Sequence, residues 1–345
     1  MIVGGIAMLL GGAVAAAAAA LAVVHSVSPF ITAYPWSASG FGTKFANPAT
    51  LPSSIGYGVA FSPAGTQIAV GTQTNPWITA YSWNGSGFGT KFANPATLPG
   101  GQGNIVAFSP AGTEIALADN VSPRIIAYPW SASGFGTKFA NPATLPAGSG
   151  MGVAFTPSGD AIAVSHNVSP HISVYPWSAS GFGTKFANPG TLPTQQGNSV
   201  AFSPAGTEIA VVTSAAALTL LAYPWSASGF GTKFANPATL PGTAGYDVAF
   251  SPAGTEIAVG ANASPYILAY PWSASGFGTK FANPATLPAG IGTGVAFSKA
   301  GTEIAVSHYT TPFVTAYPWS ASGFGTKFAN PTTLPTGQAN KVAFT

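Results

Sequence analysis

The stretch Tyr34-Pro-Trp-Ser-Ala-Ser-Gly-Phe-Gly-Thr-Lys-Phe-Ala-Asn-Pro-Ala-Thr-Leu-Pro52 decides the fold, because it returns almost unchanged six more times along the chain. A second module, Val-Ala-Phe-Ser-Pro-Ala-Gly-Thr-Glu-Ile-Ala-Leu at Val106–Leu117, lies between successive copies. The tryptophan of the first module recurs every 47 residues, with one interval of 48, at Trp36, Trp83, Trp130, Trp177, Trp225, Trp272 and Trp319. Self-similarity at this period is typical of a solenoid, an array or a propeller.

Turn residues divide each period into four short runs, which we call strands a, b, c and d. In the second period the runs are Val59–Phe61, Gln67–Val70, Ile78–Trp83 and Lys91–Leu98. Runs of β-branched and aromatic residues between Gly, Pro, Asn and Ser predict antiparallel strands. Strand d carries a proline in mid-run in every copy, so we expect it at a sheet edge. Four strands, of which the outermost carries a proline that hinders further strand pairing, describe one blade of a propeller.

The motif Val-Ala-Phe-Ser-Pro-x-Gly-x-x-Ile-Ala-Val, followed by an Ile-x-Ala-Tyr strand, resembles the repeat of the WD-repeat and lactonase-like (YVTN-type) seven-bladed propellers. The resemblance covers about residues 16–345 and implies an all-β ring of seven four-stranded antiparallel blades. Tyr-Pro-Trp stands where WD repeats carry Trp-Asp, and the hydrogen-bonding Asp/His set of that family is absent, so no residue role is carried over. The Gly-Phe-Gly-Thr-Lys-Phe-Ala-Asn-Pro copies also resemble tandem repeats of predicted bacteriophage proteins.

The two ends of the chain carry incomplete blades. Val342–Thr345 has the pattern of strand a with no strand b behind it, and Leu21–Val23 has the pattern of strand b with no strand a before it. We therefore expect the C-terminal strand a to pair with the N-terminal strand b in blade one, which removes two open sheet edges.

Residues 1–15 are surplus to the propeller, which takes residues 16–345. The first 24 residues are strongly apolar and hold no charged side chain, so three alternatives stay open. They are a cleaved secretory signal, a membrane anchor long enough to span a bilayer if residues 1–24 are retained, and a packed apolar extension. The missing Lys or Arg after Met1 counts against a signal.

Composition narrows the function classes. Charged residues make up 5% of the chain and the net charge is +3, which is too weak for nucleic-acid binding by counterion release. There is no cysteine, and hence no thiolate metal site or cysteine nucleophile. We expect no cofactor. A surface of Gly, Ser, Thr, Asn, Pro and aromatic residues suits an extracellular protein or one on a virion or cell surface.

Differences between the copies gather on one predicted face. Because neighbouring strands alternate in direction, the a–b and c–d turns lie on one face of the ring, which we call the uniform face. The b–c and d–a loops lie on the opposite face, which we call the variable face. The b–c and d–a loops hold nearly all of the differences, and four of seven residues at the start of strand c are aromatic. Mixed aromatic and polar groups suit contact with sugar rings or with a protein. The alternative is that these loop residues differ between the copies because no function constrains them. The candidate ligand-binding residues are Phe30, Tyr57, Trp77, Arg124, His166, His171, Tyr246, Asp247, Tyr266, His308, Tyr309 and Phe313.

The search for catalytic groups finds isolated acids. Most of the acids, such as Glu114, begin a strand b, where pairing with the repeated lysines such as Lys44 is expected. His166 and His171 lack a third zinc ligand nearby. The sequence therefore favours a non-enzymatic recognition or adhesion scaffold that binds a glycan or protein receptor through the variable face. The alternatives are a structural assembly or fibre component, as a homo-oligomer or attached to a larger particle, and a lactonase-like enzyme. The enzyme is disfavoured because metal-ligating acids do not converge on the channel.

Overall fold

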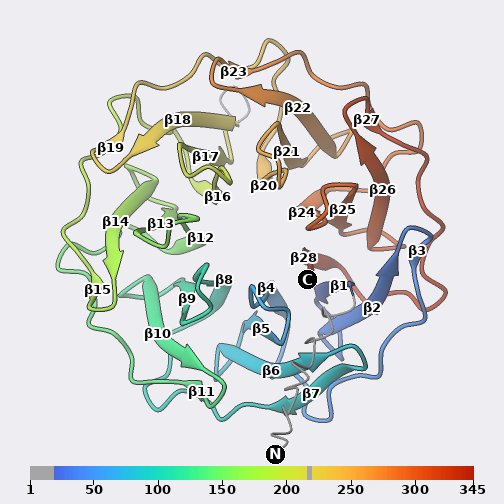
Figure 1. Cartoon of the computed structure of the whole chain (residues 1–345), viewed down its shortest axis with the longest axis horizontal. Helices are drawn as coiled ribbons and strands as arrows, with labels where there is room; N and C mark the ends of the chain where they lie inside the picture. The colour runs from blue at the N-terminus through green and yellow to red at the C-terminus, as the bar shows by residue number, and fades with distance from the viewer. Residues whose placement is uncertain (1–18, 216–219) are drawn as a thin grey trace, which may run out of the picture.

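The computed structural model describes residues 19–215 and 220–345, and within this part of the chain every regular element is a β-strand. The strands form seven antiparallel sheets of four strands each, arranged as blades around a central channel (Figure 1). The predicted seven-bladed β-propeller is confirmed. The described residues include no helix able to cross a membrane, and the prediction for residues 1–15 falls outside them.

Strands a and b form the inner half of each blade. The copies of strand a, which are innermost, are β28 (Ala339–Phe344), β4 (Gly56–Phe61), β8 (Gly103–Phe108), β12 (Gly150–Phe155), β16 (Gly197–Phe202), β20 (Gly245–Phe250) and β24 (Gly292–Phe297). The copies of strand b are β1 (Ala20–His25), β5 (Gln67–Thr72), β9 (Glu114–Asp119), β13 (Ala161–His166), β17 (Glu208–Thr213), β21 (Glu256–Ala261) and β25 (Glu303–His308).

Strands c and d form the outer half. The copies of strand c are β2 (Ile31–Ser37), β6 (Ile78–Asn84), β10 (Ile125–Ser131), β14 (Ile172–Ser178), β18 (Leu220–Ser226), β22 (Ile267–Ser273) and β26 (Val314–Ser320). The copies of strand d are β3 (Gly40–Phe41), β7 (Gly87–Lys91), β11 (Gly134–Phe135), β15 (Gly181–Phe182), β19 (Gly229–Phe230), β23 (Gly276–Phe277) and β27 (Gly323–Phe324).

Strand d differs from its predicted position and length. It consists of the Gly-Phe pair that follows strand c, and the run from the lysine through the proline lies beyond it. Strand c carries Pro35, or its equivalent, on the side that faces strand d, and proline has no N–H to donate to that ladder. Blade two has Ser82 at this position, and there strand d extends to Lys91, which pairs with Tyr81.

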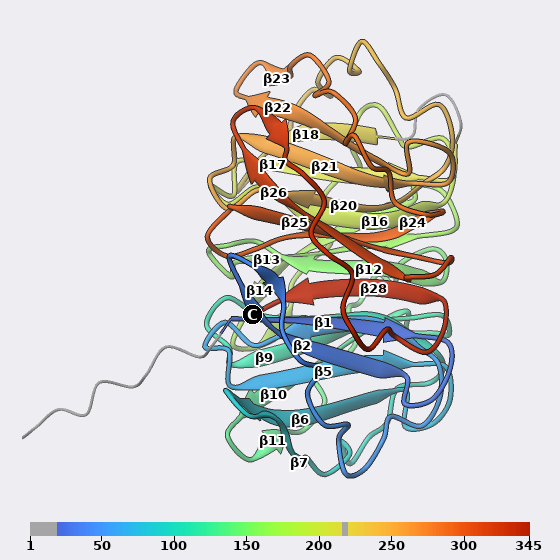
Figure 2. The same ribbon diagram turned by 90° about the vertical axis from the view of Figure 1, so that its right-hand side faces the viewer.

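The ring closes within blade one as predicted. β28 pairs with β1 from Leu21↔Phe344 to Val24↔Lys341, with a register shift after Val24. The Thr345 amide also donates to the Ala20 carbonyl at 3.0 Å. The first described residues and the C-terminus therefore lie together at the uniform face (Figure 2).

The hydrophobic core lies between neighbouring blades. One cluster combines Ala69 and Ile78 of blade two with Val106 and Ile115 of blade three, and each further cluster repeats this arrangement. The repeated tryptophan packs edge-on against three phenylalanines, which for Trp83 are Phe45, Phe61 and Phe88 at centroid distances of 5.2, 5.1 and 4.9 Å. Phe45 belongs to the preceding blade, so this contact joins blades as well as strands.

Candidate functional site

Six of the candidate residues at the start of strand c share one backbone role. They have φ angles between 61° and 71°, in the left-handed region, and their side chains are half-buried. The Trp77 amide donates to the Thr74 carbonyl and the Trp77 carbonyl accepts from the Thr72 amide, both at 2.8 Å, which closes the b–c loop. Ligand contact by their side chains stays a prediction. The six are Phe30, Trp77, Arg124, His171, Tyr266 and Phe313.

The candidate histidines His166 and His308 end strand b and are fully buried, as is His25. His166 Nε2 lies 3.1 Å from Ser173 Oγ, and His308 Nε2 lies 2.9 Å from Thr315 Oγ1, so each ring ties strand b to strand c. Burial lowers the pKa of all three imidazoles to about 4, so they are neutral at pH 7. The structure gives these rings no exposed surface for ligand contact.

Asp247 and Tyr246 lie at the mouth of the central channel on the variable face, because strand a starts on that face. Asp247 is the third residue of strand a in blade six, and Lys341 at the same position in blade one lines the channel cavity. Its equivalents in the other blades are Gly58, Ile105, Gly152, Ser199, Gly294 and Lys341. The mouth thus combines one acid, one base and several residues with little or no side chain.

The Asp247 carboxylate connects four consecutive blades. Asp247 is 1% exposed, and Oδ1 lies 2.5 Å from Lys341 Nζ of blade one. Oδ1 also accepts a 2.8 Å hydrogen bond from Ser199 Oγ of blade five, and Oδ2 accepts one of 2.8 Å from the Val295 amide of blade seven. Because its oxygens are occupied in this way, Asp247 acts as an anchor that orients Lys341.

Three candidate tyrosines lie on the variable face, with Tyr57 and Tyr246 near the start of strand a and Tyr309 directly after a strand b. Burial raises the pKa of the Tyr309 phenol, and electrostatic repulsion from the Tyr246 and Tyr57 phenolates would raise it further. Burial also raises the pKa of Tyr57. Tyr309 and Tyr57 are therefore protonated at neutral pH and can donate hydrogen bonds to a ligand at the mouth.

Tyr57, Tyr246, Asp247 and Tyr309 were among the residues predicted from the sequence, whereas Lys341 and Ser199 were not. The signal for Lys341 was its position, since no other copy has a basic residue at the third place of strand a. The side chain of Lys341 is 17% exposed, and it also lines the cavity in the channel. Its ammonium group is therefore held by Asp247, while its side chain lines the channel.

Other polar groups are engaged in local structure. The buried carboxylate of Asp119 accepts from the amides of Gly100, Gly101 and Val121, and burial raises its pKa. The expected pairing of glutamates with the strand-d lysines is wrong, because Lys44 donates to Asn47 Oδ1 at 2.6 Å and the six equivalent lysines bind the equivalent asparagines. Within the described residues, no three His, Asp or Glu side chains gather as a metal site.

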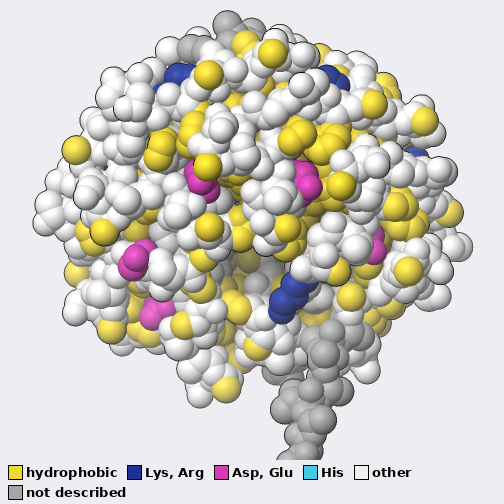
Figure 3. Space-filling view, turned by 45° about the horizontal axis from the view of Figure 1, so that its top comes forward, with side chains coloured by type: hydrophobic (Ala, Val, Ile, Leu, Met, Phe, Trp, Pro, Cys, Tyr) yellow, Lys and Arg dark blue, Asp and Glu magenta, His cyan; other side chains and the backbone are white. Residues whose placement is uncertain are grey.

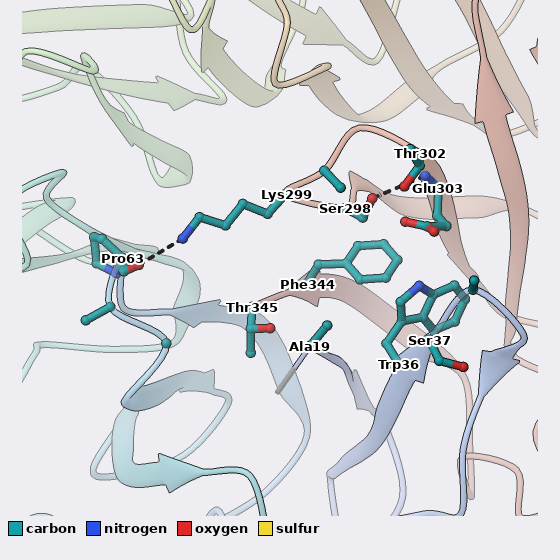
Figure 4. Close-up of a pocket in the computed structure, with 14 residues that line it drawn as sticks. Ala19, Trp36, Ser37, Pro63, Ser298, Lys299, Thr302, Glu303, Phe344 and Thr345 are labelled. Carbon is teal, nitrogen blue, oxygen red and sulfur yellow. Dashed lines mark hydrogen bonds between the residues drawn. The ribbon is translucent and has the colours of Figure 1, made fainter. Parts of the chain in front are cut away.

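The uniform face carries a second hollow. Acidic side chains surround the hollowed centre of this face (Figure 3). No turn joins β28 to β1, and a cavity of about 680 Å³ opens there, compared with about 140 and 160 Å³ between complete a–b turns. Lys299 extends across this notch toward the Pro63 carbonyl, above Phe344 and Trp36 (Figure 4). Ala19, the first described residue, lies in the wall of this notch.

The chain matches no protein-family model and no curated protein sequence. Its fold matches solved structures over nearly their full length. A candidate 6-phosphogluconolactonase from Bacteroides uniformis has a TM-score of 0.72 at 14% identity, covering 95% of this chain and 99% of that one. The periplasmic gluconolactonase PpgL of Pseudomonas aeruginosa has a TM-score of 0.68 at 14% identity, covering 94% and 99%. At such identities the likeness establishes the fold.

These neighbours correct two expectations of the sequence analysis. They contradict the non-enzymatic recognition scaffold and the statement that the protein is not an enzyme, because they carry the names of lactonases. An enzyme was disfavoured from the sequence because no metal-ligating acids were expected to converge on the channel. The charged pair found beside the channel is Lys341 with Asp247.

Proposed function

We propose that the protein is a lactonase-like hydrolase that opens a lactone ring at the channel mouth on the variable face. The observation that carries the proposal is Lys341, whose ammonium is anchored by the buried Asp247 carboxylate and whose side chain lines the channel. The structural neighbours named as lactonases support it through their fold, which spans 94% or more of this chain.

The proposed reaction follows from the charges at the mouth. Water adds to the lactone carbonyl carbon, and the negative charge that develops on the carbonyl oxygen is stabilised by Lys341. The ring C–O bond then breaks, the leaving oxygen takes a proton that originates from the water, and a hydroxy acid is released. Tyr57 and Tyr309 add hydrogen-bond donors to the substrate. Asp247 is already engaged with three donors, so it orients Lys341 and does not serve as the base.

Glucono-δ-lactone and 6-phosphoglucono-δ-lactone are the first substrates to test. Acid release by the full chain is followed by titration at constant neutral pH, and spontaneous hydrolysis is subtracted. We expect catalysed hydrolysis by the native protein and a loss of about 100-fold or more in Lys341→Met, the scale for removing one oxyanion donor.

Lys299→Met is the matched control, because Lys299 lies on the opposite, uniform face, where its ammonium donates to the Pro63 carbonyl. We expect it to retain the native rate. Circular dichroism confirms that both variants fold. A native rate equal to spontaneous hydrolysis with both lactones, or equal rates for native protein and Lys341→Met, would overturn the proposal.

A further inference from the structure

The charges at the mouth of the channel cancel one another. The mouth is formed by the first residues of the seven strands a, which are innermost and begin at the variable face. Among the first three residues of these strands, Lys341 and Asp247 are the only charged side chains. They form an ion pair with each other, so the mouth carries no net charge.

The other basic side chains lie away from this mouth. Of the ten lysines and arginines in the chain, seven are the repeated lysines that bind asparagines on the outer side of strand c. Lys299 lies on the uniform face. Arg124 begins a strand c, two strands outward from the channel, and its Nη1 donates to the Pro146 carbonyl at 3.0 Å. All ten are in the described residues, and Lys341 alone stands at the mouth.

The mouth is nevertheless rich in neutral polar groups. Strand a pairs only with strand b, so its inner edge faces the channel with backbone N–H and C=O groups that no strand pairs. The second residues of strands a add half-buried phenol and amide groups, those of Tyr57, Tyr246, Asn198 and Asn340. A hydroxyl group both donates and accepts hydrogen bonds, so it can pair with neutral groups of either kind.

We propose that the substrates are uncharged lactones with several hydroxyl groups, and that a phosphate group on the lactone is disfavoured. This inference rests on the lactonase function proposed above and assigns its substrate class. A phosphate group carries about two negative charges near neutral pH. It would lose water at a mouth where the one ammonium group, that of Lys341, is already paired with Asp247, and this loss is costly.

The test compares glucono-δ-lactone with 6-phosphoglucono-δ-lactone on the full chain, each corrected for spontaneous hydrolysis. We expect kcat/KM to be about tenfold higher or more for the uncharged lactone, because one charge-assisted hydrogen bond is worth a factor of that size. An equal or higher kcat/KM for the phosphorylated lactone would overturn the inference and leave the lactonase function standing. Absence of catalysis with both lactones would overturn the inference and the lactonase function together.

Two variants each add one net positive charge to the mouth. Asp247→Asn removes the carboxylate charge at nearly constant shape and leaves the Lys341 ammonium without its counter-charge. Tyr246→Lys places an ammonium group next to Asp247 in the chain, and Tyr246→Gln is its neutral control.

The quantity to measure in these variants is the ratio of kcat/KM for the phosphorylated lactone to kcat/KM for the uncharged lactone. We expect this ratio to rise by about tenfold in Asp247→Asn and in Tyr246→Lys, and to stay at the native value in Tyr246→Gln. Circular dichroism identifies the variants that fold. An unchanged ratio in either charged variant that folds, or an equal rise in Tyr246→Gln, would overturn the inference.

Discussion

Replacing Asp247 with alanine should destabilise the ring more than the loss of any other single carboxylate in the described residues. The change leaves the Lys341 ammonium, the Ser199 hydroxyl and the Val295 amide without their acceptor. Removing one partner of a buried ion pair costs about 3–5 kcal/mol. Lys341 keeps some access to water at 17% exposure, so we expect about 3 kcal/mol for Asp247→Ala.

Urea unfolding followed by tryptophan fluorescence measures this loss of unfolding free energy. Adding Lys341→Met to Asp247→Ala removes the unpaired charge and should recover about 1 kcal/mol or more. Asp160→Ala is the control, because that exposed carboxylate accepts hydrogen bonds from the Thr156 and Ser158 hydroxyl groups of its own turn. Equal destabilisation by Asp247→Ala and Asp160→Ala, or no recovery in the double variant, would refute the role of Asp247 as a tie between blades.

Three further predictions concern the ring itself. Deleting residues 341–345 removes most of β28 and exposes the edge of β1, so calorimetry should show a large fall in Tm; an unchanged Tm would contradict closure by this strand. Trp177→Ala should cost about 3–5 kcal/mol in urea unfolding, since this ring is buried between three phenylalanines, whereas the half-buried Trp77→Ala should cost far less. Burial lowers the pKa of His25, His166 and His308 from 6.5 to about 4. Between pH 6.5 and about 4 the unfolded state therefore binds protons that the folded state does not, so the free energy of unfolding falls as the pH falls. The urea midpoint should decrease over that interval, and less steeply in His166→Gln; parallel profiles would rule out this histidine as a source.

Features that recur in every copy were predictable from the sequence. The period, the turn residues and the Val-Ala-Phe and Ile-Ala-Val runs predicted the blades, and the incomplete blades at the two ends predicted pairing of β28 with β1. Repetition made these inferences secure, since each local pattern was observed seven times. The exception was strand d, where the proline of strand c, on the neighbouring strand, ends the ladder after two residues.

The candidate site depends on features that occur once, and these were harder to predict. Asp247 could be placed on the variable face, but its contacts with Ser199, Val295 and Lys341 join residues 48 or more positions apart in sequence. The histidines were treated as surface groups, because nothing in a strand-b pattern indicates that the last residue turns inward to Ser173 or Thr315. Contacts between blades require the curvature of the ring, which no single repeat encodes.

The pairing of β28 with β1 in blade one has a consequence for how the order of the chain could be rearranged. Thr345 and Ala20 lie within hydrogen-bond distance, with the Ala20 amide donating to Thr345 Oγ1 at 3.0 Å, and six other blades join the same two strands through a short Gly-containing turn. A turn of that sequence could link residue 345 to residue 20, and the chain could then be opened at any of the other six turns. Circular permutants of this kind would keep every blade and every contact between blades while moving the termini around the ring.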